Sequence, residues 1–91
     1  MARARACVLT PVAGEIRLDS PDDAALIAAL HRRVPHDERR WDGASWYVTR
    51  AHEATVIELA RGFPVAQWVE GRRVTDLHTG RTWEQLTLFD A

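Results

Sequence analysis

The sequence predicts a small α+β domain, in which an antiparallel sheet carries two helices on one face and a C-terminal tail follows. A length of 91 residues suffices for one modest hydrophobic core and a single domain. With 46% hydrophobic and 27% charged residues, the composition is that of a globular chain. The apolar spacing changes twice from the alternation of strands to the period of helices, which gives the order β-β-α-β-β-α-β-β. We expect the domain over residues 1–82 and the tail over residues 83–91.

The first strands and helix follow from local signals. Residues 7–10 form a short apolar run and residues 15–19 alternate, with Gly14 between them, so a hairpin is expected. Ser20 is then a candidate helix cap, followed by Pro21 at the first helical position. This helix is expected to end near Arg33. Its apolar stripe is predicted to be Ala24, Ile27, Leu30 and Val34, with Leu26 beside it.

The second half of the domain is expected to contain a hairpin, a helix and two further strands. The dipeptide Asp42-Gly43 predicts the turn of a hairpin between aromatic and β-branched residues. A second helix is expected over residues 50–61, capped by Thr49. Two further strands, over residues 65–69 and 73–77, are expected to follow.

The composition excludes several classes of function. The net charge of −1 provides no overall positive field, so any contact with DNA must come from a local patch. All twelve basic residues are arginines, whose planar guanidinium suits phosphate or carboxylate. The single cysteine, Cys7, excludes a disulfide framework, and no run of residues approaches a membrane span. We therefore expect a cytoplasmic protein without a membrane partner.

No arrangement of residues indicates catalysis. The four histidines share no metal-ligand spacing, and no Gly-rich phosphate loop is present. The two serines, Ser20 and Ser45, are not in the context of a nucleophile. We therefore expect a protein that is not an enzyme and that binds no cofactor and no metal.

The clearest functional signal lies at the C-terminus, in Gln85-Leu86-Thr87-Leu88-Phe89. This pentapeptide resembles the sliding-clamp-binding motif of bacterial replication and repair proteins, which is Gln-Leu, then Ser or Asp, then Leu-Phe. Four positions match and Thr87 replaces Ser. The resemblance implies that Leu88 and Phe89 fill a hydrophobic cleft of the clamp, that Leu86 covers a neighbouring apolar patch, and that Gln85 hydrogen-bonds at its mouth.

An edge strand is the alternative interpretation of the same segment. Residues 82–89 alternate roughly, so Trp83, Leu86 and Leu88 could pack on the sheet instead. The position of the motif two residues from the chain end favours clamp binding, as does Gln85, which strand packing does not require.

A basic-aromatic hairpin lies between the two expected helices, with Arg39-Arg40 before Trp41 and with Trp46 after the turn. Residues 14–62, about half of the chain, are similar to the HARP domain of annealing helicases and to the related N-terminal module of XPB-type helicases. No helicase motor is present, so the resemblance implies binding of a DNA structure alone.

The residues themselves suggest a DNA contact near the end of the first helix. The guanidinium group of arginine can form paired hydrogen bonds with a phosphate, and a tryptophan can stack on an unpaired base. The candidate residues are Arg32, Arg33, Arg39, Arg40, Trp41 and Trp46. However, Asp37, Glu38 and Asp42 lie in the same stretch and would neutralise such a patch, and the tryptophans could belong to the core.

Three hypotheses result. The first is a DNA replication or repair accessory protein that binds the sliding clamp through its tail, either to recruit machinery or to block the cleft as a phage or mobile-element inhibitor would. The second is a nucleic-acid-binding module without a clamp link. The third is a structural protein that assembles with itself, for example through an edge strand near the C-terminus.

Overall fold

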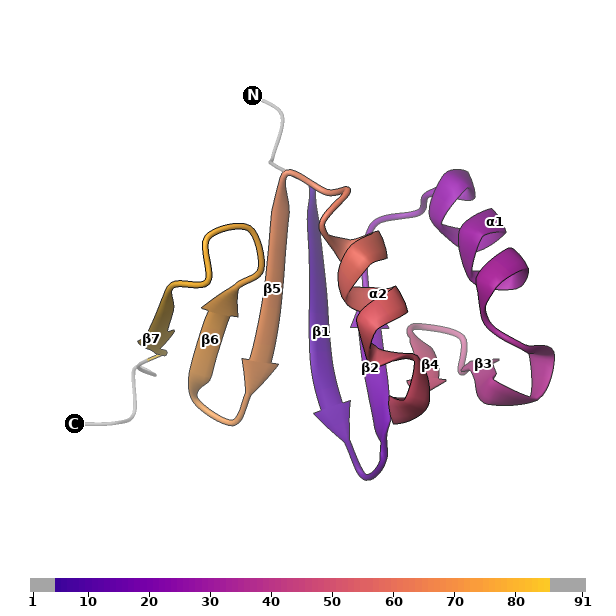
Figure 1. Ribbon diagram of the computed structural model, residues 1–91, viewed down its shortest axis with the longest axis horizontal. Coiled ribbons are helices and arrows are strands. Elements are labelled where there is room, and N and C mark those ends of the chain that lie inside the picture. Colours follow the sequence, from indigo (N-terminus) through magenta and orange to yellow (C-terminus); the bar gives the residue numbers. More distant parts are fainter. Residues whose placement is uncertain (1–4, 86–91) are drawn as a thin grey trace.

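The structure is a computed structural model that describes residues 5–85. Its strands form one seven-stranded sheet in the order β3-β4-β2-β1-β5-β6-β7 (Figure 1). In chain order the elements are β1 (Ala6–Val12), β2 (Glu15–Asp19), α1 (Ala24–Arg33), the 3₁₀ turn η1 (His36–Glu38), β3 (Arg39–Trp41), β4 (Trp46–Thr49), the 3₁₀ turn η2 (Arg50–His52), α2 (Glu53–Ala60), β5 (Val65–Glu70), β6 (Arg73–Asp76) and β7 (Thr82–Glu84). The α+β class is confirmed.

The sheet is mostly antiparallel, and it contains one parallel pair of strands that the sequence did not predict. β1 and β5 run parallel, with Leu9 opposite Trp68, whereas the other neighbouring strands are antiparallel. Between β4 and β5 the chain passes through α2, which returns it to the end of the sheet at which β1 begins (Figure 1). β5 therefore enters beside β1 in the same direction.

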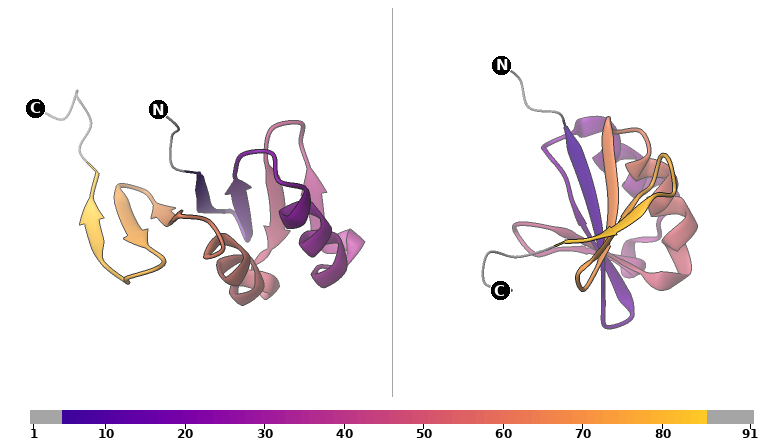
Figure 2. Two further views of the ribbon diagram at one scale, coloured as in Figure 1. Left: turned by 90° about the horizontal axis from the view of Figure 1, so that it is seen from above. Right: turned by 90° about the vertical axis from the view of Figure 1, so that its left-hand side faces the viewer.

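Both helices lie on the same face of the sheet, as expected (Figure 2). The core lies between this face and the helices, and its fully buried side chains alternate along the central strands. On the strands they include Cys7, Leu9, Ile16, Leu18 and Val48, and the helices α1 and α2 add Leu30 and Val56.

Helix α1 begins three residues later than a cap at Ser20 would place it. The carboxylate of Asp23 accepts a hydrogen bond from the backbone N–H of Leu26 at 2.9 Å, and Asp23 is therefore the N-cap. The hydroxyl of Ser20 instead donates to the carbonyl of Pro21. Asp23 is also held by an ion pair with Arg5, which favours the cap at this position.

The core-facing side of α1 is rotated relative to the predicted stripe. The buried residues are Leu26, Ala29 and Leu30, whereas Ala24 is exposed and Ile27 retains 38% exposure. The first seven residues of this helix are all apolar, so more than one apolar stripe satisfies the helical period. Packing against α2 and the sheet selects the stripe that contains Leu26.

The second helix also begins later than expected. Residues 50–52 form η2, and α2 begins at Glu53 without a side-chain cap from Thr49. The hydroxyl of Thr49 is buried without a hydrogen-bond partner. The two expected hairpins are confirmed, as β1–β2 and β3–β4, and the expected strands near residues 65–69 and 73–77 are present as β5 and β6.

Acid is expected to destabilise this fold through two carboxylates that bind backbone N–H groups. Hydrogen bonds from Leu26 to Asp23, and from Ser45 and Ala44 to Asp42, hold the pKa of both aspartates below the usual 3.8. Because both values are lowered on folding, the stabilisation is present above pH 3.8 and is lost as the pH falls through the folded values.

Urea denaturation at a series of acidic pH values measures this effect. The Asp23→Asn and Asp42→Asn double variant keeps side chains that can accept the same bonds but removes both ionisations. Its free energy of unfolding should depend less on pH than that of the parent. If the free energy of unfolding of the variant falls as steeply with decreasing pH as that of the parent, other carboxylates are responsible.

Candidate functional site

The two candidate tryptophans form a cross-strand pair on the β3–β4 hairpin. Trp41 lies opposite Trp46, with ring centroids 5.4 Å apart and planes tilted by 49°. Trp46 packs against the core and meets the ring of His31 edge-on at 5.9 Å, whereas Trp41 is 52% exposed. Trp41 therefore has an open ring surface, and Trp46 supports it from within the domain.

Three of the four candidate arginines already have acceptors within the fold. Arg33 forms an ion pair with Glu58 at 2.9 Å, and Arg39 donates to the carbonyl of Val34. Arg40 donates to both carboxylate oxygens of Glu15, at 2.8 and 3.2 Å. The hydrogen bond from Arg40 lowers the pKa of Glu15, which therefore stays ionised over a wider acidic range.

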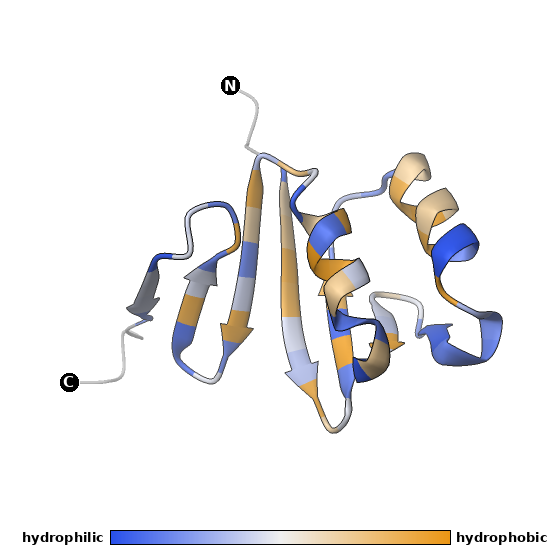
Figure 3. Ribbon diagram, viewed as in Figure 1, coloured by the Kyte–Doolittle hydropathy of each residue, from blue (hydrophilic) through white to orange (hydrophobic). Residues whose placement is uncertain are grey.

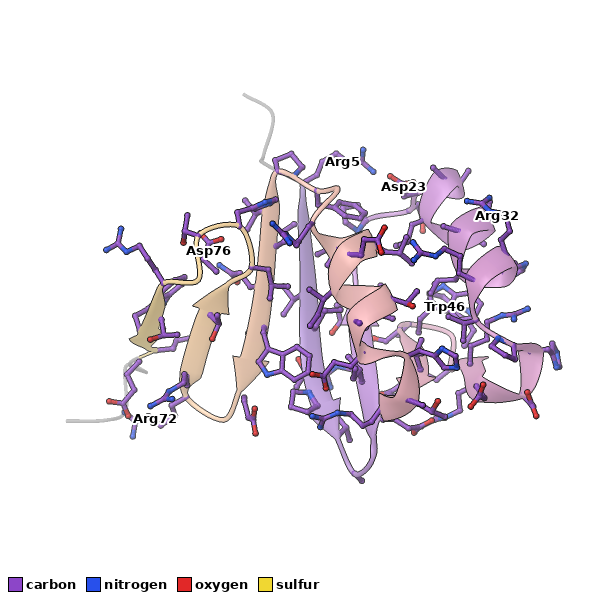
Figure 4. All side chains as sticks on the ribbon, viewed as in Figure 1. Arg5, Asp23, Arg32, Trp46, Arg72 and Asp76 are labelled. Atoms are coloured by element: carbon purple, nitrogen blue, oxygen red, sulfur yellow. The ribbon has the colours of Figure 1, made fainter. Side chains whose placement is uncertain are left out.

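The fourth arginine, Arg32, is exposed in the last turn of α1 (Figure 4). Its side chain has no hydrogen bond or ion pair within residues 5–85. It is therefore the candidate arginine that is available to an external acceptor.

The hairpin separates the candidates between the two faces of the sheet. Trp41 pairs with Trp46 and Arg40 pairs with Tyr47, and neighbouring residues of a strand point to opposite faces. The guanidinium of Arg40 lies 4.0 Å from the centre of the Tyr47 ring, on the face opposite to the helices. A ligand on the ring of Trp41 would therefore not be held by Arg40.

Two aspartates lie beside the tryptophan pair. Trp41 and Trp46 line a small cavity together with Asp22 and Asp23 of the loop before α1 and with Ile27. This cavity measures about 20 Å³, which is the space of roughly one water molecule. It is too small for a nucleobase or a cofactor, so only the outer surface of Trp41 can receive a ligand.

The start of the C-terminal motif lies directly after the last strand. β7 pairs with β6, with Trp83 opposite Val74, and the backbone N–H of Gln85 donates to the carbonyl of Arg72 at 2.6 Å. The sheet thus extends through Glu84, past the boundary expected at residue 82. The remaining motif residues, Leu86, Thr87, Leu88 and Phe89, lie outside the described residues.

An open hollow beside this strand was missed by the sequence analysis. It has a volume of about 510 Å³ and contains basic, acidic and aromatic side chains, from Glu70, Arg72, Arg73, Thr82, Trp83 and Glu84. Only the pairing of β5, β6 and β7 brings these residues together, so no sequence signal could have revealed it. Trp83 is 45% exposed there, two residues before Gln85.

Searches for other sites and for known relatives give no further lead. Within residues 5–85, no group of three or more His, Cys, Asp or Glu side chains could hold a metal ion. In the same part of the chain, no helix is long and apolar enough to cross a membrane. A comparison of the chain with protein-family models, with curated proteins and with solved structures finds no match.

Proposed function

We propose that the protein is a non-enzymatic accessory factor of DNA replication or repair that docks on a bacterial-type sliding clamp through Gln85, Leu86, Thr87, Leu88 and Phe89. The observation that carries the proposal is the motif itself, which begins one residue after β7 ends. Gln85 is exposed at the outer edge of the sheet, far along the strand order from β3 and α1. A partner can therefore approach Gln85 without contacting the helices.

The chemistry of the motif suits such a cleft. Two apolar anchors, Leu88 and Phe89, would supply most of the binding energy, and Gln85 would fix the register through hydrogen bonds. Isolated peptides of this size bind with dissociation constants on the order of micromolar. The folded body would then be held at sites where the clamp is loaded.

Calorimetric titration of the intact protein into a purified bacterial clamp tests the proposal. The Leu88→Ala and Phe89→Ala double variant is expected to lose binding, because both anchors of the cleft are removed. Asp90→Ala, outside the motif but in the same segment, is the matched control and should bind like the parent.

The melting temperature of each variant completes the test. The double variant should melt close to the parent, since β7 ends before Gln85. A large loss of thermal stability would favour the packed-strand interpretation of the motif, and equal binding by parent and double variant would refute clamp docking through these residues.

A DNA contact of the hairpin has less support. Arg33, Arg39 and Arg40 are engaged within the fold, which leaves Arg32 and the ring of Trp41. Phosphate binding by so few cations would give a shallow dependence of affinity on salt. We therefore propose clamp docking as the function and do not propose DNA contact by the hairpin.

A further inference from the structure

The exposed side of α1 lacks the polar residues that a solvent-facing helix normally carries. Its first two turns expose Ala24, Ala25, Ile27 and Ala28, and the polar residues begin only at His31 (Figure 3). A surface helix usually has charged or polar side chains opposite its buried stripe. The outer face of α1 therefore has the composition of a surface that is covered.

A second exposed apolar side chain extends this face. Ile27 and Trp41 line the same small cavity and are 38% and 52% exposed, so they form one patch that continues from α1 onto the hairpin. Large exposed apolar residues that lie side by side indicate an interaction surface more often than single ones do.

Opposite charges border the patch at its two ends. The carboxylate of Asp22 lies just before α1, and the guanidinium of Arg32 lies in its last turn. Neither side chain has a hydrogen bond or ion pair within residues 5–85. When two copies of this face meet in opposite orientations, the carboxylate of each copy lies near the guanidinium of the other.

We infer that this face, comprising Ala24, Ile27, Ala28, Arg32 and Trp41 with Asp22 at its border, binds a second copy of this chain. The two α1 helices would pack antiparallel across a twofold axis near Ala28, the arrangement in which one patch serves both partners. Ala24 and Arg32 lie four residues to either side of Ala28, so the axis places Arg32 of one copy against Ala24 of the other. Asp22 precedes the N-cap Asp23, at the same end of α1 as Ala24, so the long side chain of the partner's Arg32 can pair with it.

The antiparallel arrangement is also favoured by the helix ends. The positive end of each α1 would lie beside the negative end of its partner, and small alanines allow the two helices to approach closely. The patch is small compared with the interfaces of permanent dimers, so the association is weak and depends on concentration.

Sedimentation of the full chain over a wide range of concentrations tests this inference. The parent should change from a monomer of 10.3 kDa toward twice that mass as the concentration rises. Ala28→Glu places two like charges at the axis and should weaken association by at least about tenfold. Glutamate is a good helix former and Ala28 is exposed, so this variant should fold.

Matched variants distinguish this interface from other causes of association. Ala54→Glu changes an exposed alanine of α2 in the same way and should dimerise like the parent. Asp22→Arg and Arg32→Asp should each weaken the dimer, whereas the double exchange should restore it. A parent that stays monomeric at all concentrations, or a dimer that Ala28→Glu leaves intact, would overturn the inference, which does not depend on clamp docking.

Discussion

Replacing Leu9 with alanine is expected to lower the free energy of unfolding by about 2–5 kcal/mol. Leu9 is 0% exposed in the central strand β1, where it lies between Leu18 of β2 and Trp68 of β5. The truncation removes contacts to both neighbouring strands and leaves a cavity that a close-packed core fills only in part. Against the total of about 5–15 kcal/mol typical of a domain, this change removes a large share of the stability.

Urea denaturation followed by tryptophan fluorescence measures this loss. Val12→Ala, on the same strand at a position with 38% exposure, is the control and should change the free energy of unfolding by about 0.5 kcal/mol or less. Similar losses from the two substitutions would contradict the placement of the core on the helix side of β1.

Cys7 is expected to react with thiol reagents very slowly in the native protein. Burial raises the pKa of its thiol from 9.0 to about 12, and the residue is fully buried beneath the helices. A rise of three units lowers the thiolate fraction near neutral pH by about 1000-fold, and the thiolate is the reactive form. The close packing of the core also keeps the reagent from reaching the sulfur atom.

Labelling with a chromogenic disulfide reagent measures this protection. The denatured chain should react at once, and the native chain should react only when it opens transiently. Leu9→Ala should accelerate native labelling because it increases the population of open molecules. Equal labelling rates for the native and denatured chains would show that Cys7 is accessible and that the core around β1 is wrongly assigned.

Local signals account for the parts of the fold that the sequence predicted. The β1–β2 and β3–β4 hairpins each have alternating residues around a turn that needs positive φ, and Gly14 and Gly43 adopt φ of 85° and 99°. Such pairings join neighbouring segments, so the residues that specify them are adjacent in the chain. The same holds for the β5–β6 hairpin around Gly71.

The parallel pair of strands and the buried side of α1 were not predicted because both depend on contacts between segments far apart in the chain. The parallel pairing of β1 with β5 joins segments about 60 residues apart, and no spacing within either strand encodes it. In α1 the helical spacing of apolar residues fits two sides of the helix, one with Ile27 and one with Leu26, so the spacing alone does not identify the buried side. That ambiguity reflects the second apolar face from which we infer self-association.

The candidate site was predicted only in part for a similar reason. Arg40 and Trp41 are adjacent in sequence, and a strand directs such neighbours to opposite faces. The sequence also could not reveal that Glu15 and Glu58, far away along the chain, neutralise Arg40 and Arg33. The C-terminal pentapeptide needs no such tertiary information, because a linear motif is specified by its own residues.

The central claim is that the C-terminal pentapeptide binds the clamp, and competition tests it most directly. A synthetic peptide of residues 84–91 is titrated into a preformed complex of the intact protein and the clamp, with a peptide that carries Leu88→Ala and Phe89→Ala as its control. We predict that the parent peptide displaces the protein completely, with an affinity on the order of micromolar, and that the control peptide does not. An intact protein that does not bind the clamp, or that stays bound at saturating parent peptide, would contradict the claim.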